Sequence, residues 1–474
     1  MPTRRHPRRP VLLAAVALAA GLPHPAAAQA TAFVDVSVIP MDRERVLERQ
    51  TVIVRDGRIA SVGPSASASV PADAVRIDGR GRFLMPGLAE MHAHVPPQGA
   101  SEQLLQDIMF LYTANGVTTI RGMLGATYQL ALAKRLNAGA MLGPTFYVAA
   151  PSINGTSAPD PATAARLVRE HKAAGYDLLK IHPGPSRATY DSTVAVARQV
   201  GITLGGHIPA LVGIDHALAS RQATIDHLDG YVEGAVSEAM KARIASPTDT
   251  VYPQQIWRAV QPERLRDYAR RTREAGVYNV PTMFLWENFT RADTAEAIAA
   301  TLPELKYAPR QWVNGWMNQK RQRTTLDRQL RISPADAEHH LALRRQMLKH
   351  LADAGAPILM GTDSPQMFNV PGFALHRELQ VMANAGLTPF QILQSGTATV
   401  ARYAREVLQL DGNFGTVAPG MRADLVLLDA NPLQDVANLQ RRAGVMVRGR
   451  WVSAEEITKG LADLETRMKA SPGN

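Results

Sequence analysis

The chain has 474 residues, of which 46% are hydrophobic, and a formal net charge of +10. This length allows two or three domains, or one large barrel with additional segments, and a sizeable core. The absence of cysteine excludes disulfides, thiolate metal ligands and cysteine nucleophiles, so that histidine, carboxylate or a modified lysine would have to hold any metal. The basic residues form no stripe with interleaved aromatics, which argues against nucleic-acid binding.

Residues 1–30 are typical of a secretory signal peptide. Arginine pairs at positions 4–5 and 8–9 precede an apolar run over 11–20, and small residues at 26–30 suit a signal peptidase. The apolar run is shorter than the roughly 20 residues that cross a bilayer. We therefore expect an exported protein, periplasmic or extracellular after cleavage, without a stable membrane anchor. The Sec and twin-arginine routes both remain open, and loss of the four arginines lowers the formal charge to +6.

Short β-like segments with alternating apolar residues occur near both ends of the remaining chain. They are found at 32–40, 51–63, 423–429 and 445–452. Asp56 and Gly57 stand where a hairpin turn requires positive φ angles. We predict that residues 31–86 and 408–456 together build one small composite β-sandwich domain.

In the middle of the chain, apolar β-like runs alternate with helical patterns. The runs are 84–94, 116–121, 144–149, 177–182, 202–207, 223–227, 277–280 and 357–363. Helical patterns follow four of them at 127–138, 161–174, 187–199 and 212–219. Strands that are buried on both faces and alternate with helices form parallel sheets. Eight such units predict an α/β protein with a (β/α)8 barrel of the TIM type over residues 87–407, followed by a C-terminal helix or tail over 457–474.

Two connections in this region are too long for simple crossovers. Residues 228–276 and 281–335 are rich in charge and contain four of the five tryptophans. Long connections at the mouth of a barrel are typical of lids or substrate walls. The alternative is that they are surface insertions without a role.

Potential metal ligands lie at the ends of five predicted strands. His92 and His94 are two residues apart in one strand, so their side chains point to the same face. The carboxyl ends of TIM-barrel strands meet around the active site, and imidazole is a common metal ligand. Any one of these residues alone is more simply a hydrogen-bonded core residue, but together they predict a metal site formed by His92, His94, Lys180, His207, His227 and Asp363.

The order of these residues resembles the amidohydrolase superfamily, with Gly87–His94 early and Gly361-Thr362-Asp363-Ser364 late in the chain. The resemblance covers nearly all of the chain after residue 30. It is closest to the branch with imidazolonepropionase-like proteins and binuclear prolidase-type (Xaa-Pro/Arg/Lys) carboxypeptidases. It implies two divalent metal ions, with zinc as the expected element. By position, His92, His94 and Asp363 would hold the more buried ion, and His207 and His227 the more exposed one.

The same resemblance implies that Lys180 bridges both ions as a carboxylated lysine. An unmodified lysine has a pKa of about 10.4 and would repel two cations, whereas a carbamate supplies two oxygen ligands. The alternative is an ordinary ion-paired lysine beside a single metal. True imidazolonepropionases are expected to be mononuclear and to lack this lysine, so Lys180 argues against that reaction. Glu90 and Gly122 stand where many relatives have aspartate, which affects contacts around the metal ligands.

The expected chemistry is hydrolysis by a metal-activated water. Metal binding lowers the pKa of water from 15.7 toward roughly 7. Asp363 is the expected catalytic residue, because its carboxylate can take the proton of the attacking water and pass it to the leaving nitrogen. His182 and Tyr231 are candidate substrate-binding residues, since prolidase-like relatives are expected to bind a substrate carboxylate through a tyrosine near this position.

These observations predict an exported metal-dependent amidohydrolase that cleaves a C–N amide bond of a small molecule. A dipeptide or an N-acyl amino acid is the expected substrate, and a homo-oligomer is compatible with the sequence. One alternative is a hydrolase of cyclic amides, lactones or esters that uses the same site. An alternative of another class is a non-catalytic binding protein with the fold retained, which would predict a lost ligand or a missing Asp363, and neither is seen.

Overall fold

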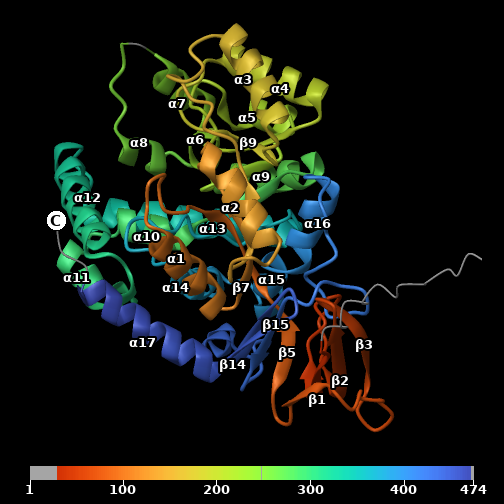
Figure 1. Cartoon of the computed structure of the whole chain (residues 1–474). Helices are drawn as coiled ribbons and strands as arrows, with labels where there is room; N and C mark the ends of the chain where they lie inside the picture. The colour runs from red at the N-terminus through yellow and green to blue at the C-terminus, as the bar shows by residue number, and fades with distance from the viewer. Residues whose placement is uncertain (1–28, 247, 471–474) are drawn as a thin grey trace, which may run out of the picture.

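Eight parallel segments form a closed barrel in the middle of the chain (Figure 1). The computed structural model describes residues 29–246 and 248–470. Two parallel sheets contribute seven strands: β6 (Leu88–Ala93), β7 (Val117–Gly122), β8 (Thr145–Val148), β9 (Leu178–Ile181), β10 (Thr203–Gly206), β11 (Thr224–Asp226) and β12 (Tyr278–Val280). Parallel bridges Ala149–Leu178, Asn279–Ile358 and Ala93–Ser364 join these sheets to each other and to the eighth segment. The prediction of an α/β fold with a (β/α)8 barrel is therefore confirmed.

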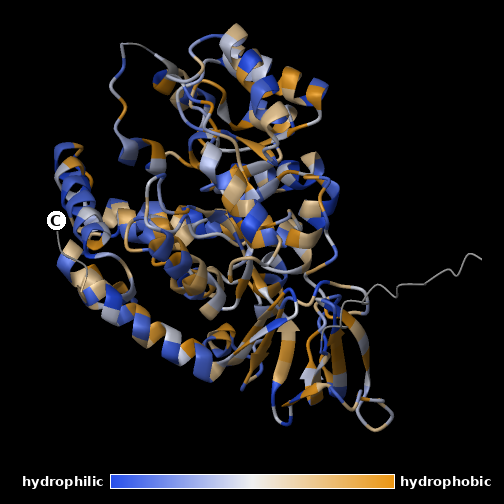
Figure 2. Cartoon of the chain, in the orientation of Figure 1, coloured by the Kyte–Doolittle hydropathy of each residue, from blue (hydrophilic) through white to orange (hydrophobic). Residues whose placement is uncertain are grey.

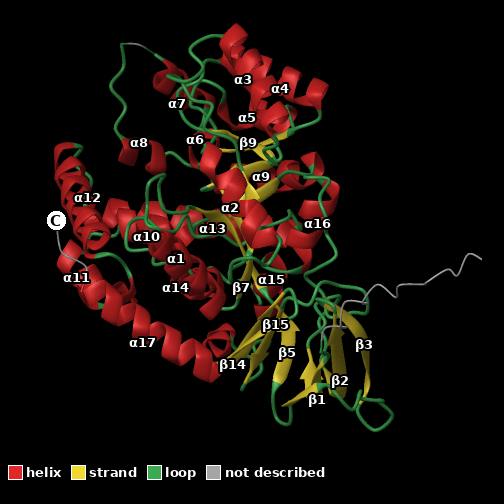
Figure 3. Ribbon diagram, viewed as in Figure 1, coloured by secondary structure: helices red, strands yellow, loops and turns green. Residues whose placement is uncertain are grey.

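The barrel strands are buried on both faces, as their apolar composition predicts. Every residue of β6, β7 and β9 is buried. Helices cover the outside of the barrel (Figure 3): α1 (Glu102–Ala114), α2 (Thr127–Asn137), α3 (Pro161–Ala174), α4 (Arg187–Val200), α5 (Gly213–Ala219), α9 (Pro262–Ala275), α13 (Pro334–Ala354), α14 (Phe373–Asn384), α15 (Pro389–Ser395) and α16 (Ala398–Glu406). Side chains inside the barrel are therefore shielded from water except at its ends.

Local signals in the sequence set the ends of helix α3. The Asp160 carboxylate accepts a hydrogen bond from the Thr163 backbone N–H at 2.8 Å, and Pro161 occupies the first turn. Gly175 ends the helix with φ +89°, a left-handed conformation that favours glycine. The predicted helix over 161–174 therefore has the observed bounds.

The two long connections fold into additional helices. The first contains α6 (Tyr231–Gly234), α7 (Glu238–Ala245) and α8 (Pro253–Arg258). The second contains α10 (Met283–Thr290), α11 (Ala295–Ala300), the 3-10 helix η1 (Pro303–Tyr307) and α12 (Arg310–Gln329). Helix α12 lies at the left edge of the molecule in Figure 1. Residues of α10 and α12 in the second connection line the large cavity described below, and a role as a substrate wall stays a prediction.

Strands from both chain ends form one eight-stranded sheet beside the barrel (Figure 1). These strands are β1 (Thr31–Val38), β2 (Leu47–Arg55), β3 (Arg58–Pro64), β4 (Val75–Asp78), β5 (Phe83–Pro86), β13 (Leu425–Leu428), β14 (Arg442–Val447) and β15 (Arg450–Ser453). Antiparallel pairing of β13 with β5 joins the two chain ends. Asp56 and Gly57 have φ angles of 51° and 72° in the predicted hairpin turn. The sheet leads directly into β6, so it anchors the strand that carries the first two histidines.

Helix α17 (Ala454–Ala470) packs along the barrel beyond this sheet. Apolar and hydrophilic residues alternate along it in Figure 2, as expected for a helix with one buried face. Arg467 donates to the Asp107 carboxylate of α1 at 2.6 Å. None of the helices within the described ranges is long and apolar enough to cross a membrane. Residues 1–28 of the predicted signal peptide lie outside the described residues.

Candidate metal centre

All six predicted metal ligands lie at the carboxyl end of the barrel. His92 is in β6 and Lys180 is in β9, whereas His94, His207 and His227 directly follow the ends of β6, β10 and β11. Asp363 belongs to the eighth segment, where its backbone N–H donates to the His92 carbonyl at 2.8 Å. Segments that are up to 271 positions apart in the chain therefore meet at one point because the barrel closes.

Short distances connect the side chains of this cluster. One ligand atom from each of His92, His227 and Asp363 lies within 4.8 Å of the others. His94 Nε2 is 2.6 Å from Asp363 Oδ1, and Lys180 Nζ is 3.3 Å from His92 Nε2. These distances bring five of the six predicted ligands into one group.

His207 completes the cluster through its neighbour His227. Their rings are stacked with centroids 4.5 Å apart, and the centroids of His92 and His227 are 4.6 Å apart. The structure therefore brings all six predicted residues together, with His207 on the side that faces the cavity.

The second ring nitrogens of three histidines lie beside residues that the sequence analysis did not identify. Asp226 Oδ2 is 2.9 Å from His92 Nδ1, close enough for an ion-pair contact but without hydrogen-bond geometry. Asp229 Oδ2 is hydrogen-bonded to His207 Nδ1 at 2.7 Å. Thr282 Oγ1 is 2.8 Å from His227 Nδ1. Such contacts fix the orientation and tautomer of a metal-binding imidazole. The sequence signal for the two aspartates is weak, since they are simply close to His227 in the chain.

A buried arginine supports Asp226 from inside the barrel. Arg121 is fully buried, and its Nη2 lies 3.3 Å from both Asp226 oxygens. Its Nε donates to the Met91 carbonyl at 2.7 Å, and its Nη1 donates to the Tyr403 hydroxyl at 3.1 Å. A buried cation requires this kind of pairing. Asp226 is thus held between Arg121 and His92.

Glu90 and Gly122, which depart from the family pattern, both have a structural explanation. Glu90 accepts hydrogen bonds from the His92 N–H at 3.0 Å and from the N–H and hydroxyl of Thr362 at 2.8 and 2.6 Å. It therefore joins β6 to the segment that carries Asp363. A Cβ atom on Gly122 would lie 2.6 Å from the Phe146 ring, so close packing favours glycine at that position.

The protonation states of the cluster suit a divalent metal. Burial lowers the pKa of His92 and His227 well below the usual imidazole value. Burial alone raises the pKa of Asp363, but His92 and His94 outweigh it and hold the pKa below its usual range. Neutral imidazole and ionised carboxylate are the forms that bind metals. The donor set of these residues therefore fits a metal cofactor.

Lys180 is completely enclosed beneath this cluster. Burial lowers the pKa of the Lys180 amine. Its Nζ lies 3.9 Å from Asp226 Oδ2. At that distance no hydrogen bond forms. A close ion pair with Asp226 therefore does not explain why a lysine is buried at this position.

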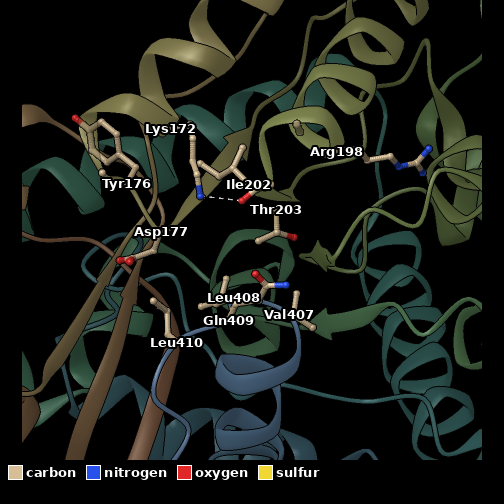
Figure 4. A pocket seen from close by; sticks show the side chains of 13 residues that line it. Lys172, Tyr176, Asp177, Arg198, Ile202, Thr203, Val407, Leu408, Gln409 and Leu410 are labelled. Carbon is tan, nitrogen blue, oxygen red and sulfur yellow. Dashed lines mark hydrogen bonds between the residues drawn. The ribbon is translucent and has the colours of Figure 1, made fainter.

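A cavity of about 840 Å³ opens over the metal-ligand cluster. His92, His94, His207, His227 and Asp363 form its floor, and side chains from α10 and α12 form part of its wall. A second cavity of about 500 Å³ lies near the amino ends of β9 and β10 (Figure 4). The described residues that line this second cavity include none of the predicted metal ligands.

His182 and Tyr231, the two predicted substrate contacts, lie in different environments. His182 lines the large cavity, where its Nδ1 is 2.6 Å from Ser152 Oγ and its ring stacks on His207. Tyr231 is fully buried, and its hydroxyl lies 2.9 Å from both Thr272 Oγ1 and Asn279 Oδ1. The single turn of α6 directs the Tyr231 side chain into the core, and Tyr231 is not among the residues that line the cavity.

A (β/α)8 barrel with histidines and an aspartate converging at its carboxyl end is the architecture of metal-dependent hydrolases of C–N bonds. A family model described as "Amidohydrolase family" matches residues 83–452. The chain belongs to the amidohydrolase family.

Relatives with curated names include an imidazolonepropionase and an adenine deaminase. The imidazolonepropionase of Paracoccus denitrificans (strain Pd 1222) is 25% identical over 425 residues, which cover 86% of this chain and 94% of that protein. The adenine deaminase of Nitratidesulfovibrio vulgaris (strain DP4) is 30% identical over 225 residues. That match covers 41% of this chain and 37% of the deaminase. The chain thus matches little more than a third of the length of this relative.

Two solved structures have the same overall fold. A bottromycin amidohydrolase superposes with a TM-score of 0.68 at 24% identity, covering 93% of this chain and 90% of that chain. A Xaa-Pro dipeptidase with bound methionine in its active site superposes with a TM-score of 0.63 at 18% identity, covering 90% and 100%. At these identities the similarity establishes the fold alone.

Proposed function

We propose that the protein is a metal-dependent amidohydrolase that cleaves a C–N amide bond of a small molecule, with dipeptides and N-acyl amino acids as the first candidates. The observation that carries this proposal is the cluster of candidate ligands, five of which form the floor of a cavity of about 840 Å³ while Lys180 lies beneath them. A cavity of this size accommodates a drug-sized ligand. Family membership and the protonation states of His92, His227 and Asp363 support the same conclusion.

We further propose that two divalent ions, zinc in the first instance, bind here. His92, His94 and Asp363 would hold one ion, and His207 and His227 would hold the other. A carboxylated Lys180 would contribute to both sites. Its lowered pKa favours the neutral amine, which is the form that adds carbon dioxide and loses a proton to become a carbamate.

The metal ions would supply a water of lowered pKa and a Lewis acid for the substrate carbonyl. Asp363 accepts the proton of the attacking water while the new C–O bond forms. As the C–N bond breaks, Asp363 returns this proton to the leaving nitrogen. His182, oriented by Ser152, is positioned on the cavity wall to hydrogen-bond the substrate.

Free amino acid release tests this function directly. Zinc-loaded protein lacking residues 1–30 is incubated with pooled dipeptides and N-acyl amino acids, and products are identified by mass spectrometry. Release from a defined subset, abolished in Asp363→Asn, is the expected result. No release from protein that contains about two metals per chain would favour the alternative electrophiles, which are cyclic amides, lactones and esters. A retained fold without catalysis would give no product from any of these compounds.

We also propose that the protein is exported. The composition of residues 1–30 supports this proposal. N-terminal sequencing of the protein recovered outside the cytoplasm is expected to begin near residue 31. Recovery of the whole chain only from the cytoplasm would contradict it.

A further inference from the structure

The wall of the large cavity is aromatic. Trp286 of α10 and Trp312 and Trp316 of α12 line it, together with Tyr128 of α2. Trp286 and Trp312 are half-buried, whereas Trp316 is buried and packs on Phe368 with centroids 6.3 Å apart. Aromatic side chains of this size bury a large apolar area of a ligand.

The same wall carries almost no charge. Apart from the histidines and Asp363, the described residues that line this cavity include no lysine, arginine, aspartate or glutamate. Besides the aromatic residues, five glutamines contribute uncharged polar groups to the lining: Gln98, Gln129, Gln311, Gln319 and Gln366. Glutamine donates and accepts hydrogen bonds without charge. Removing a carboxylate from water is unfavourable unless a cation pairs with it.

Two cations that belong to or pack against the elements of the wall, Arg344 and Lys320, already have partners outside the cavity. The Arg344 guanidinium lies 4.1 Å from the Trp286 ring centroid and donates to the His227 carbonyl. Lys320 of α12 donates to the Phe289 and Arg291 carbonyls at 3.3 and 2.5 Å. Neither cation lines the cavity. These contacts hold the aromatic wall in place, and the described residues that line the cavity include no lysine or arginine that could receive a substrate carboxylate.

Four buried polar atoms in cavity-lining residues have no hydrogen-bond partner among the described residues: Gln129 Oε1, Trp286 Nε1 and the Nδ1 atoms of His92 and His94. Gln129 donates from Nε2 to the Leu124 carbonyl at 3.0 Å, and its Oε1 is unpaired. Trp286 Nε1 is also unpaired. Buried polar groups normally have partners. Gln129 Oε1 and Trp286 Nε1 are therefore one acceptor and one donor, both uncharged, that no group of the described residues satisfies beside the cavity.

From this wall we propose that the preferred substrates are uncharged amides with a large, flat apolar group. This inference rests on the proposed amidohydrolase function, and among the amides that such a site could cleave it favours those without a free carboxylate over the dipeptides and N-acyl amino acids named above. Trp286, Trp312 and Trp316 hold the apolar group, and the glutamines bind neutral polar groups. A carboxylate next to the scissile bond weakens binding because no side-chain cation pairs with it.

Three amides with a common acetyl group test the proposal. N-acetylphenethylamine, N-acetylphenylalanine and N-acetylethylamine differ in the carboxylate and in the ring. A second set with the ring on the acyl side covers the opposite orientation. In at least one of the two sets, we expect the neutral aromatic amide to have a kcat/KM about tenfold or more above that of its carboxylate analogue. A tenfold ratio corresponds to about 1.4 kcal/mol. We expect a larger advantage over the compound without a ring. A preference for the carboxylate, or equal rates without the ring, would overturn the proposal.

Substitutions at Gln311, an exposed residue at the mouth, change the charge of the wall without touching the metal ligands. Gln311→Arg is expected to raise the relative kcat/KM for the carboxylate analogue several-fold, and Gln311→Glu is expected to lower it. The matched control is Gln434→Arg, which makes the same change at an exposed position outside the cavity and should leave the ratio unchanged. Equal effects of both arginine variants would contradict the proposal.

Calorimetric titration separates failure of this inference from failure of the proposed function. If metal-loaded protein cleaves none of the amides, the proposed function fails, and all the compounds can then be titrated as stable ligands. Tighter binding of the neutral aromatic amide would still support the inference. Tighter binding of the carboxylate, or no binding of either compound, would overturn it.

Discussion

Cavities open at both ends of the barrel. The polar side chains of one cavity converge on a single point, whereas those of the other bond to nearby backbone groups. At the carboxyl end, side chains from separate strands converge, and three of them place ligand atoms within 4.8 Å of one another. At the amino end (Figure 4), Lys172 Nζ donates to the Gly201 carbonyl at 2.9 Å, and Asp177 Oδ2 accepts from the Val148 N–H at 2.7 Å. Polar side chains that hydrogen-bond to backbone groups of the protein stabilise the fold. Side chains that converge on one point are instead available to bind a ligand. Convergence, not cavity size alone, therefore distinguishes the functional end.

The largest effect is expected for Asp363→Asn. The amide cannot accept a proton from water, so kcat should fall by on the order of 10² to 10⁴ while most metal is retained. Steady-state kinetics and metal analysis on the same sample measure both quantities. Asp177→Asn is the matched control at the amino end and should remain active. Metal loss in Asp363→Asn would mean that this residue acts chiefly as a structural ligand.

Lys180→Ala should lose much of the bound metal, because the proposed carbamate contributes ligands to both metal sites. Metal content after gel filtration is expected to fall, and a short carboxylic acid should restore part of the metal and the activity by replacing the carbamate oxygens. Lys172→Ala controls for the loss of a lysine at the opposite end. Full metal content in Lys180→Ala would exclude the bridging role.

A smaller effect is expected for Asp226→Asn, which changes a residue that touches His92 but is not a proposed ligand. Weaker support of the imidazole should lower metal affinity by roughly 10- to 100-fold. Competition with a chromophoric chelator measures this affinity, and excess zinc should restore most of the activity. Unchanged affinity would show that Arg121 and Asp226 serve only the folding of the barrel.

Trp312→Ala should affect substrate selection and leave the metal centre intact. We expect kcat/KM for neutral aromatic amides to fall by about tenfold, with little change for amides that lack a ring. Trp451→Ala, in the sheet beside the barrel, is the matched control. A uniform loss for all substrates would indicate a general disturbance of the site.

The smallest effects are expected at the amino end. Asp177→Asn and Lys172→Ala each remove contacts to backbone groups, which should lower the free energy of unfolding by about 1 kcal/mol. Activity should stay within about twofold of the starting value after normalisation to folded protein. Loss of metal in either variant would remove the distinction between the two ends.

The barrel and the convergence of the six candidate ligands were predictable because their signals are local. Fully buried strands give short apolar runs, and each ligand stands at or just beyond the end of such a run, as Lys180 and His207 do. The geometry of the fold then brings these residues together. The carboxylated state of Lys180 and the number of metals stay predictions.

The contacts around the ligands were not predictable, because they depend on tertiary packing. Arg121 reaches Asp226 across 105 positions of sequence, and no periodic pattern indicates this pair. The orientation of Tyr231 toward the core could not be predicted either, because it depends on the packing of a single helical turn. Trp257, in the first long connection, stacks on His340 with centroids 4.3 Å apart and does not line the large cavity.

The most direct test of the metal centre is an anomalous difference map, measured at the zinc edge, from a crystal of zinc-loaded protein. We predict two peaks at the carboxyl end of the barrel, one beside His92, His94 and Asp363 and the other beside His207 and His227. Additional density on Lys180 should join them. A single peak with unmodified Lys180 would contradict the binuclear centre, and peaks only elsewhere would contradict the assignment of the functional end.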